Sequence, residues 1–209
     1  MKIKKKVKKT FIIITIIILV LALSIGGYFV YKRFRSSTKT TTVKIVNEIK
    51  DYGYTLEEDA PKEYKKLFEE LDKVLKEEPV DEEAYAKLVA QMLVFDFYNL
   101  DNKISKNAVG GTEFILSDYE KNFVYEATET VYKYIEHNVY GDRKQELPKV
   151  SSTSVESVRT NNYSYKKISD DKAYIVKVKV EYEEDLGYPT EVTVKMLHND
   201  EKLEVFYMK

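Results

Sequence analysis

Apolar residues follow three successive patterns along this chain of 209 residues. Residues 11–31 form a continuous run without a charged side chain. Residues 61–140 place apolar side chains three or four positions apart, which is typical of helices that bury one face. From residue 149 onwards the spacing becomes two, which is typical of strands. The sequence therefore predicts one long apolar helix, then a group of helices, and then a group of strands.

The uncharged run is long enough to cross a membrane. A helix over residues 11–31 spans roughly 31 Å, which is about the thickness of the hydrocarbon core of a bilayer. Six lysines lie in residues 2–9 before it, and three basic residues follow in residues 32–35. The positive-inside rule then places the N-terminus in the cytoplasm. We expect a basic tail over residues 1–10, a transmembrane helix over 11–31 in the plasma membrane, and the remainder outside the cell.

A cleaved signal peptide is the alternative interpretation of the same segment. The basic start fits it, and Ala22-Leu23-Ser24 offers a weak cleavage site. However, seven more uncharged residues follow this site before the basic residues begin. An uncleaved anchor accounts better for that continuation, while the sequence leaves cleavage after Ser24 open.

Three helices are predicted between residues of about 61 and 140. The first has Pro61 in its first turn, where a missing N–H group is tolerated. Asp81 is the expected N-cap of the second helix, which is apolar over a wide surface. Residues 117–120 read Ser-Asp-Tyr-Glu, a capping-box pattern that opens the third helix. We expect that helix to end near Gly141.

The alternating part predicts an antiparallel sheet. Helices followed by consecutive strands are typical of an α+β domain, with helices packed on a C-terminal curved antiparallel sheet. We place a polar stalk or linker at residues 32–54 and the α+β domain at residues 55–209. Strands are expected at residues 150–158, 163–168, 174–182, 192–196 and 203–207, with a turn at 198–201.

The near-neutral net charge of −1 conceals a strong segregation of charge. Residues 48–209 hold all 35 acidic residues and 23 of the 34 basic ones, which gives this part a net charge of −12. An acidic domain argues against nucleic-acid binding. The chain has no cysteine, so disulfide bonds and thiolate zinc sites are excluded.

Few residues offer catalytic chemistry. The two histidines, His137 and His198, are expected at the surface, near a helix end and in a turn. No nucleophile elbow, phosphate-binding loop or dinucleotide-binding motif is present. We therefore assign no catalytic, cofactor or metal residues. Gly110-Gly111 either forms a tight turn or lets the backbone approach a ligand.

Asp96 and Asp101 are the one pair that could support an acid/base reaction. They flank an aromatic stretch, and desolvation in such a setting raises the pKa of a carboxyl group. The simpler interpretation places Asp96 on the wet side of its helix and Asp101 in the turn that follows, because Asp is a common turn residue.

The order of elements resembles single-pass membrane proteins that carry a nuclear-transport-factor-2-like domain outside the cell. The resemblance rests on the span at residues 11–31, the helices between about 61 and 140, and the strands from about 149 to 208. This layout is similar to the inner-membrane scaffold subunit of type IV secretion and conjugation machines. Residues 96–103 with Gly110-Gly111 also look like a segment of uncharacterised membrane proteins of Gram-positive bacteria.

The resemblance implies an assembly role without catalysis. We therefore expect a membrane-anchored extracellular binding or scaffold domain that belongs to an envelope or secretion assembly. Its expected partners are the lipid bilayer, through the N-terminal helix, and a protein at the membrane, while the sequence leaves the oligomeric state open. The alternative, a small-molecule pocket protein or enzyme of the same fold, would use Asp96, Asp101 and nearby tyrosines as acid/base groups.

The predicted orientation can be tested on intact cells. Because residues 32–209 are expected outside, added protease should remove the C-terminal part and leave only a short fragment with the membrane. Immunoblotting with antibodies against the two ends measures this. A C-terminal part that is protected until the cells are lysed would reverse the predicted topology.

Overall fold

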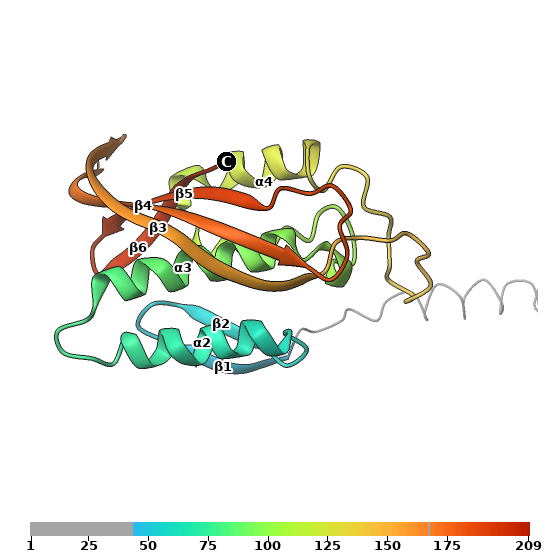
Figure 1. Ribbon diagram of the computed structural model, residues 1–209, viewed down its shortest axis with the longest axis horizontal. Helices are drawn as coiled ribbons and strands as arrows, with labels where there is room; N and C mark the ends of the chain where they lie inside the picture. The colour runs from blue at the N-terminus through green and yellow to red at the C-terminus, as the bar shows by residue number, and fades with distance from the viewer. Residues whose placement is uncertain (1–43, 167) are drawn as a thin grey trace, which may run out of the picture. The chain divides into compact units, whose positions relative to one another are not determined.

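The computed structural model describes residues 44–166 and 168–209, which belong to one compact unit from Lys44 to Lys209 (Figure 1). Its elements in chain order are β1 (Ile45–Ile49), β2 (Tyr54–Glu57), α2 (Lys62–Val74), α3 (Glu82–Tyr98), η1 (Leu100–Asn102), η2 (Thr112–Phe114), α4 (Ser117–Glu129), β3 (Val150–Tyr165), β4 (Ile168–Tyr182), β5 (Glu191–Asn199) and β6 (Lys202–Met208).

The predicted tail and transmembrane segment, residues 1–31, lie outside the described residues. Among the helices that are described, none combines the length and apolar composition needed to cross a membrane.

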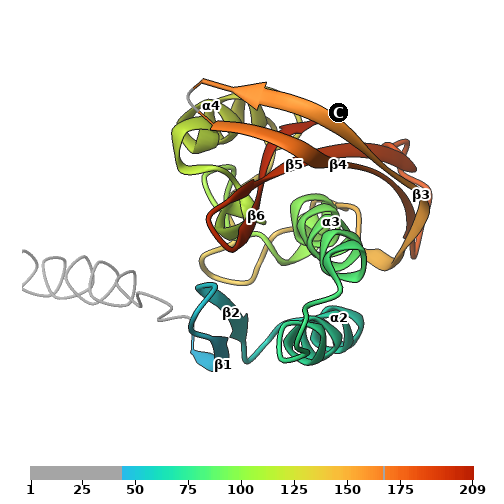
Figure 2. The ribbon, with the colours of Figure 1, turned by 90° about the vertical axis from the view of Figure 1, so that its left-hand side faces the viewer.

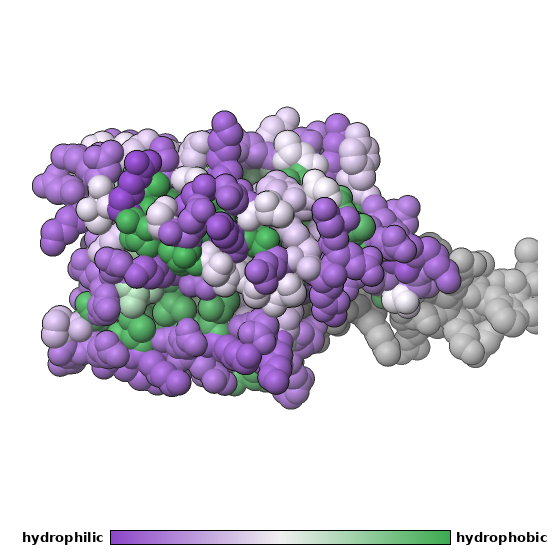
Figure 3. All heavy atoms as spheres, in the orientation of Figure 1, coloured by the Kyte–Doolittle hydropathy of each residue, from purple (hydrophilic) through white to green (hydrophobic). Residues whose placement is uncertain are grey.

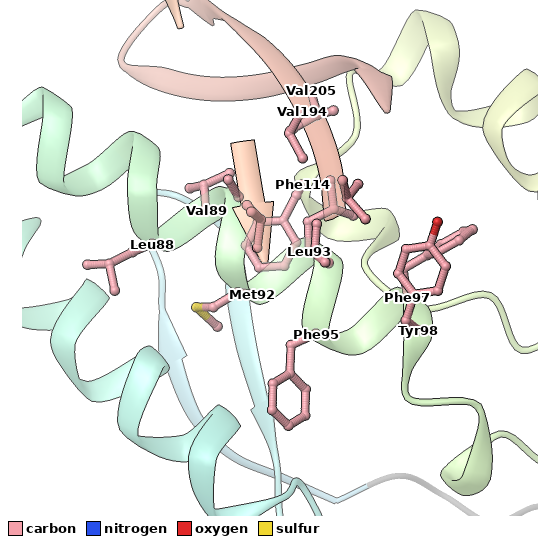
Figure 4. Packing of buried hydrophobic residues seen from close by; sticks show 14 of the residues in the cluster. Leu88, Val89, Met92, Leu93, Phe95, Phe97, Tyr98, Phe114, Val194 and Val205 are labelled. Atoms are coloured by element: carbon pink, nitrogen blue, oxygen red, sulfur yellow. The ribbon is translucent and has the colours of Figure 1, made fainter. Parts of the chain in front are cut away.

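Helix α3 is buried on almost every side. Eleven of its 17 residues are buried, so the helix has no wide polar face. A helix that is apolar all round must be covered from more than one direction. In Figure 4, Leu88, Met92 and Phe95 point to one side of the helix, while Val89 and Leu93 point toward Phe114, Val194 and Val205.

A four-stranded antiparallel sheet covers one side of α3. The strands are hydrogen-bonded in the order β3-β4-β5-β6, so each strand pairs with its neighbours in the sequence. Val176 lies opposite Val194 and Val178 opposite Val192, and all four side chains are almost completely buried. Figure 2 shows the sheet curving over α3. Alternation of apolar and polar residues thus places one face of the sheet on the helix.

Helix α2 and the β1–β2 hairpin cover the opposite side of α3, which makes three layers (Figures 1 and 2). Tyr64, Phe68 and Leu71 are the buried residues of α2. The hairpin is fixed to α3 by a hydrogen bond of 2.7 Å between the hydroxyl groups of Tyr54 and Tyr85. On the face seen in Figure 3, hydrophobic residues gather between the α2 layer and the sheet.

The α+β class, three helices and an antiparallel sheet agree with the sequence prediction. Asp81 also caps α3 as predicted, because its Oδ1 accepts a hydrogen bond from the N–H of Ala84 at 3.0 Å. Pro61 stands at the N-cap of α2, directly before the first helical residue. Capping and proline placement are local effects, which explains why the sequence located both helix starts.

The start of the domain differs from the prediction. Residues 32–54 were expected to form a stalk, but residues 45–49 and 54–57 pair as the β1–β2 hairpin. The compact unit consequently begins at Lys44 rather than at residue 55. β1 is largely exposed, so its residues lack the alternation that identifies a half-buried strand.

Two further element boundaries were wrong. Residues 150–158 and 163–168 were expected as separate strands, but Val150–Tyr165 is one strand, whose polar residues pair with β4. Helix α4 ends at Glu129 instead of near Gly141, and its N-cap is Leu116, without a side-chain cap hydrogen bond, rather than Ser117. The early end lets the following turn insert Tyr132, which is fully buried.

Candidate functional site

A cavity of about 280 Å³ lies between strand β2, the start of α2, the end of α3 and the segment before η2. Its wall combines acidic, hydroxyl, amide, aromatic and aliphatic side chains. The lining residues are Thr55, Glu57, Ala60, Pro61, Tyr64, Phe95, Asp96, Asn99, Asn102, Val109, Gly111, Thr112 and Glu113.

Glu113 is fixed in this wall by groups from two other elements. Its Oε2 accepts hydrogen bonds from the N–H and the hydroxyl of Thr55, at 3.0 and 3.1 Å. The hydroxyl of Tyr64 donates to the Oε1 atom of Glu113 over a longer distance of 3.5 Å. Oε1 is therefore the less firmly hydrogen-bonded of the two carboxyl oxygens.

The pKa of Glu113 is raised to about 7, mainly by burial and in smaller part by the charge of nearby Asp96. The hydrogen bonds from Thr55 and the charge of Lys202 act in the opposite direction. Desolvation dominates because an ionised carboxylate loses more hydration than two donors restore. Glu113 can consequently take up or release a proton near neutral pH.

Asp96 holds the segment between α3 and η2 in place. Its Oδ1 forms an ion pair of 2.5 Å with the ammonium group of Lys103, whose side chain is only 10% exposed. Its Oδ2 accepts a hydrogen bond of 2.7 Å from the N–H of Gly111. The prediction that Asp96 lies on the wet side of its helix is therefore wrong, because both oxygens are engaged in partly buried contacts.

Gly110 and Gly111 pack directly against α3, which explains why both positions are glycine. A Cβ atom at Gly110 would collide with the main-chain oxygen of Asp96. Gly111 has a φ of +73°, and a Cβ atom there would collide with Leu93. Tyr132 completes the contact, since its hydroxyl accepts from the N–H of Gly110 and donates to the carbonyl of Phe97. The predicted turn is confirmed by the positive φ of Gly111, and the close approach that the pair allows here is to α3.

Glu57 occupies the exposed rim of the cavity. Within residues 44–166 and 168–209 its carboxylate has no hydrogen-bond or ion-pair partner. Desolvation, Asp96 and Asp59 raise the pKa of Glu57, while Lys103 lowers it. Three carboxyl groups therefore line the cavity, and among the described residues only Asp96 of these three has an ion-pair partner.

Asp101 does not join Asp96. It is exposed and lines a different cavity of about 290 Å³, together with Lys149 and Glu183. Its carbonyl oxygen accepts a hydrogen bond of 2.6 Å from Arg143, which also binds the carbonyl of Lys103. The prediction of a turn at Asp101 is correct, whereas the two aspartates do not form an acid/base pair.

The histidines differ in environment. His137 is exposed, as expected. His198 lies in strand β5 rather than in the turn, and it is partly buried. Its Nδ1 is 2.8 Å from Oδ2 of Asp170. Desolvation alone would raise the pKa of Asp170. Hydrogen bonds from the N–H groups of His198 and Lys172 outweigh it, so the pKa of Asp170 is lowered.

Sequence analysis did not identify Glu57, Tyr64 or Glu113 as site residues. Glu113 is 58 residues from Thr55 and 49 from Tyr64 along the chain, so no local spacing connects Glu113 with the two residues to which it is hydrogen-bonded. The one useful indication was Gly110-Gly111 beside Glu113, because a tight Gly-Gly segment permits close backbone approach.

Comparison of the chain with protein-family models, curated proteins and solved structures found no match. In the part that the structure describes, no group of three or more histidine, aspartate or glutamate side chains could hold a metal ion. Any function therefore has to be argued from the chain's own geometry.

The close packing of Gly111 predicts a large loss of stability on substitution. In Gly111→Ala, the methyl group both meets Leu93 and occupies a left-handed backbone conformation, so the free energy of unfolding should fall by about 3 kcal/mol or more. Gly187→Ala is the matched control, because Gly187 also has positive φ but open space around it. Its cost should be about 1 kcal/mol. Urea unfolding of both variants measures the difference, and equal losses would contradict the role of the contact.

The raised pKa of Glu113 predicts a pH-dependent stability. Between pH 4.5 and about 7 the unfolded chain loses this proton while the folded protein retains it, so stability falls as the pH rises. The loss from this group should reach on the order of 3 kcal/mol. Glu113→Gln carries no such proton and should lose less stability across that interval. The free energy of unfolding of both proteins is measured from acid to neutral pH. If it changes with pH to the same extent in the variant and in the wild type, the raised pKa of Glu113 is ruled out.

Proposed function

We propose that this protein is a membrane-anchored binding domain without catalytic activity. In this proposal residues 11–31 anchor the chain in the plasma membrane, and the unit from Lys44 to Lys209 lies outside the cell. The site of binding is the cavity bounded by Glu57, Tyr64 and Glu113. The anchor is supported by the uncharged run and its flanking basic residues.

The fold that we propose is nuclear-transport-factor-2-like, with a curved sheet closing over helices in a cone. The support is the meander order β3-β4-β5-β6 and the way in which the sheet bends over α3 (Figure 2). In this proposal the β1–β2 hairpin is an addition to that fold, on the side of α3 opposite the sheet. Such an arrangement serves binding and catalytic proteins alike, so the function has to be argued from the site.

The observation that carries the proposal is a cavity whose polar groups are held by separate elements. Thr55 comes from β2, Tyr64 from α2 and Glu113 from η2, and hydrogen bonds join them. Groups positioned in this way keep their geometry without a ligand, which reduces the cost of ordering them on binding. The volume of about 280 Å³ is close to the lower end of the roughly 300–1,000 Å³ typical of ligand pockets.

The positions of Asp96 and Asp101 support binding without catalysis rather than an acid/base reaction. Asp96 is occupied by Lys103 and by the N–H of Gly111, and Asp101 lies in another cavity. The second candidate is an enzyme of the same fold. It is favoured by one observation, the pKa of about 7 at Glu113 beside the hydroxyl of Tyr64, which would suit a general base.

A ligand screen with cavity variants tests the proposal. Full-length protein in detergent micelles is titrated with a set of small metabolite-like compounds, and binding is followed by ligand-observed NMR. We expect binding that Val109→Phe abolishes, because Val109 lines the cavity and the larger ring fills it. Val139→Phe is the matched control, since Val139 is exposed and does not line this cavity.

Three outcomes of the screen are informative. Binding lost in Val109→Phe and retained in Val139→Phe supports the cavity as the ligand site, provided that both variants unfold cooperatively. Binding that is unaffected by Val109→Phe, or absent from the wild type, contradicts the proposal. Conversion of the bound compound into a product, lost in Glu113→Gln, would favour the enzyme instead.

A further inference from the structure

The charges around the cavity are not balanced. Lys103 neutralises Asp96 at 2.5 Å, but no ammonium group within the described residues pairs with the carboxylates of Glu57 or Glu113. Lys202 is the next basic residue on the Glu113 side. Its Nζ donates to the main-chain oxygen of Glu113 at 3.0 Å and lies 4.8 Å from the ring centre of Tyr54. Within the described residues, Glu57 and Glu113 therefore have no ion-pair partner.

The remaining wall is suited to an organic group rather than a bare ion. Tyr64 and Phe95 are buried aromatic residues of the wall whose ring centres are 5.7 Å apart, with Tyr64 the more accessible of the two, and Pro61 and Val109 add aliphatic surface. Aromatic faces attract ammonium groups, and aliphatic carbon favours contact with methyl or methylene groups. A metal ion would need several convergent ligands, and no such group is found among the described residues.

Two carboxyl groups that line the cavity have unused hydrogen-bond acceptors. The Oε1 atom of Glu113 has only the long contact of 3.5 Å with Tyr64, and the Glu57 carboxylate has no partner in residues 44–166 and 168–209. The Oδ1 atom of Asn99 already accepts a hydrogen bond of 3.0 Å from the N–H of Val150. The free hydrogen-bonding capacity of the cavity thus includes two carboxyl groups beside apolar surface.

We propose that the cavity binds a small organic cation with an ammonium group, held between Glu57 and Glu113 against the aromatic wall. This inference rests on the proposed function and names the class of its ligand. The volume limits the ligand to a small molecule. A neutral or anionic compound of the same shape would leave the two carboxylates unpaired, and an anion would also be repelled.

Binding of such a cation depends on pH through Glu113. The groups that face it are Thr55 and Glu57 from β2, Tyr64 from α2, Asp96 from α3, and Lys202 from β6. The cation stabilises the ionised form of Glu113, so its affinity rises as the pH increases through about 7. Bound cation consequently displaces a proton from the protein.

Calorimetric titration of full-length protein in micelles tests this inference. The probes are choline and ethanolamine, each beside a neutral analogue, dimethylbutanol for choline and ethylene glycol for ethanolamine. At least one cation should bind about tenfold more tightly than its neutral analogue, a difference expected from one additional charge interaction. Because choline carries a permanent charge, a pH dependence of its binding reports only on the protein.

Two variants and one control connect the binding to the cavity. Glu57→Gln should weaken cation binding about tenfold. Glu113→Gln should remove the rise in affinity between pH 6 and pH 8. Glu70→Gln, an equal loss of charge on the exposed face of α2, should leave the affinity unchanged. Cooperative thermal unfolding of each variant confirms that it is folded.

The outcomes separate this inference from the proposed function. If neither cation binds more tightly than its neutral analogue, the cation class is wrong, even where other compounds bind in a manner sensitive to Val109→Phe. If Glu70→Gln weakens binding as much as Glu57→Gln, the effect is general electrostatic attraction, which also overturns the inference. If no compound of either set binds, the proposed function fails as well.

Discussion

The burial of α3 on both sides is the constraint on which the described structure depends. An apolar helix exposed to water on any face would lose the hydrophobic stabilisation that its eleven buried residues provide. The sheet covers one side, while α2 and the β1–β2 hairpin cover the other (Figure 2). The hydrogen bond between Tyr54 and Tyr85 ties the outer hairpin to the helix. The order of the layers follows from the need to enclose this one element.

The cavity results from the way in which α3 is covered near its C-terminal end. Near Asp96 the helix is covered by the segment around Gly110-Gly111 instead of by a regular element, and β2 lies beside this segment, since Thr55 is hydrogen-bonded to Glu113. A backbone without side chains at positions 110 and 111 can lie directly on α3, which leaves Glu113 pointing toward Thr55. The same packing that closes the core therefore places a carboxyl group where it is partly desolvated. Its raised pKa is the electrostatic cost of that position.

The parts of the fold that were predictable depend on local or periodic effects. Asp81 and Pro61 mark helix starts because capping and proline geometry act within one turn. The alternation around Val176 and Val178 identified a strand because one face is buried. The hairpin at residues 45–57 escaped prediction, since its exposed first strand lacks alternation. Asp96 was considered together with Asp101, but its partners are Lys103 and the N–H of Gly111.

The sequence by itself determined the α+β class, the order of the three helices before the four-stranded sheet, and the separation of a basic N-terminal segment from an acidic domain. These properties are encoded in composition and periodicity, which need no knowledge of distant contacts. Only the tertiary structure decided which acidic residues share a cavity. Glu57 and Glu113 are brought together by chain segments far apart in the sequence, and the pKa of a carboxyl group depends on that environment and not on its neighbours along the chain.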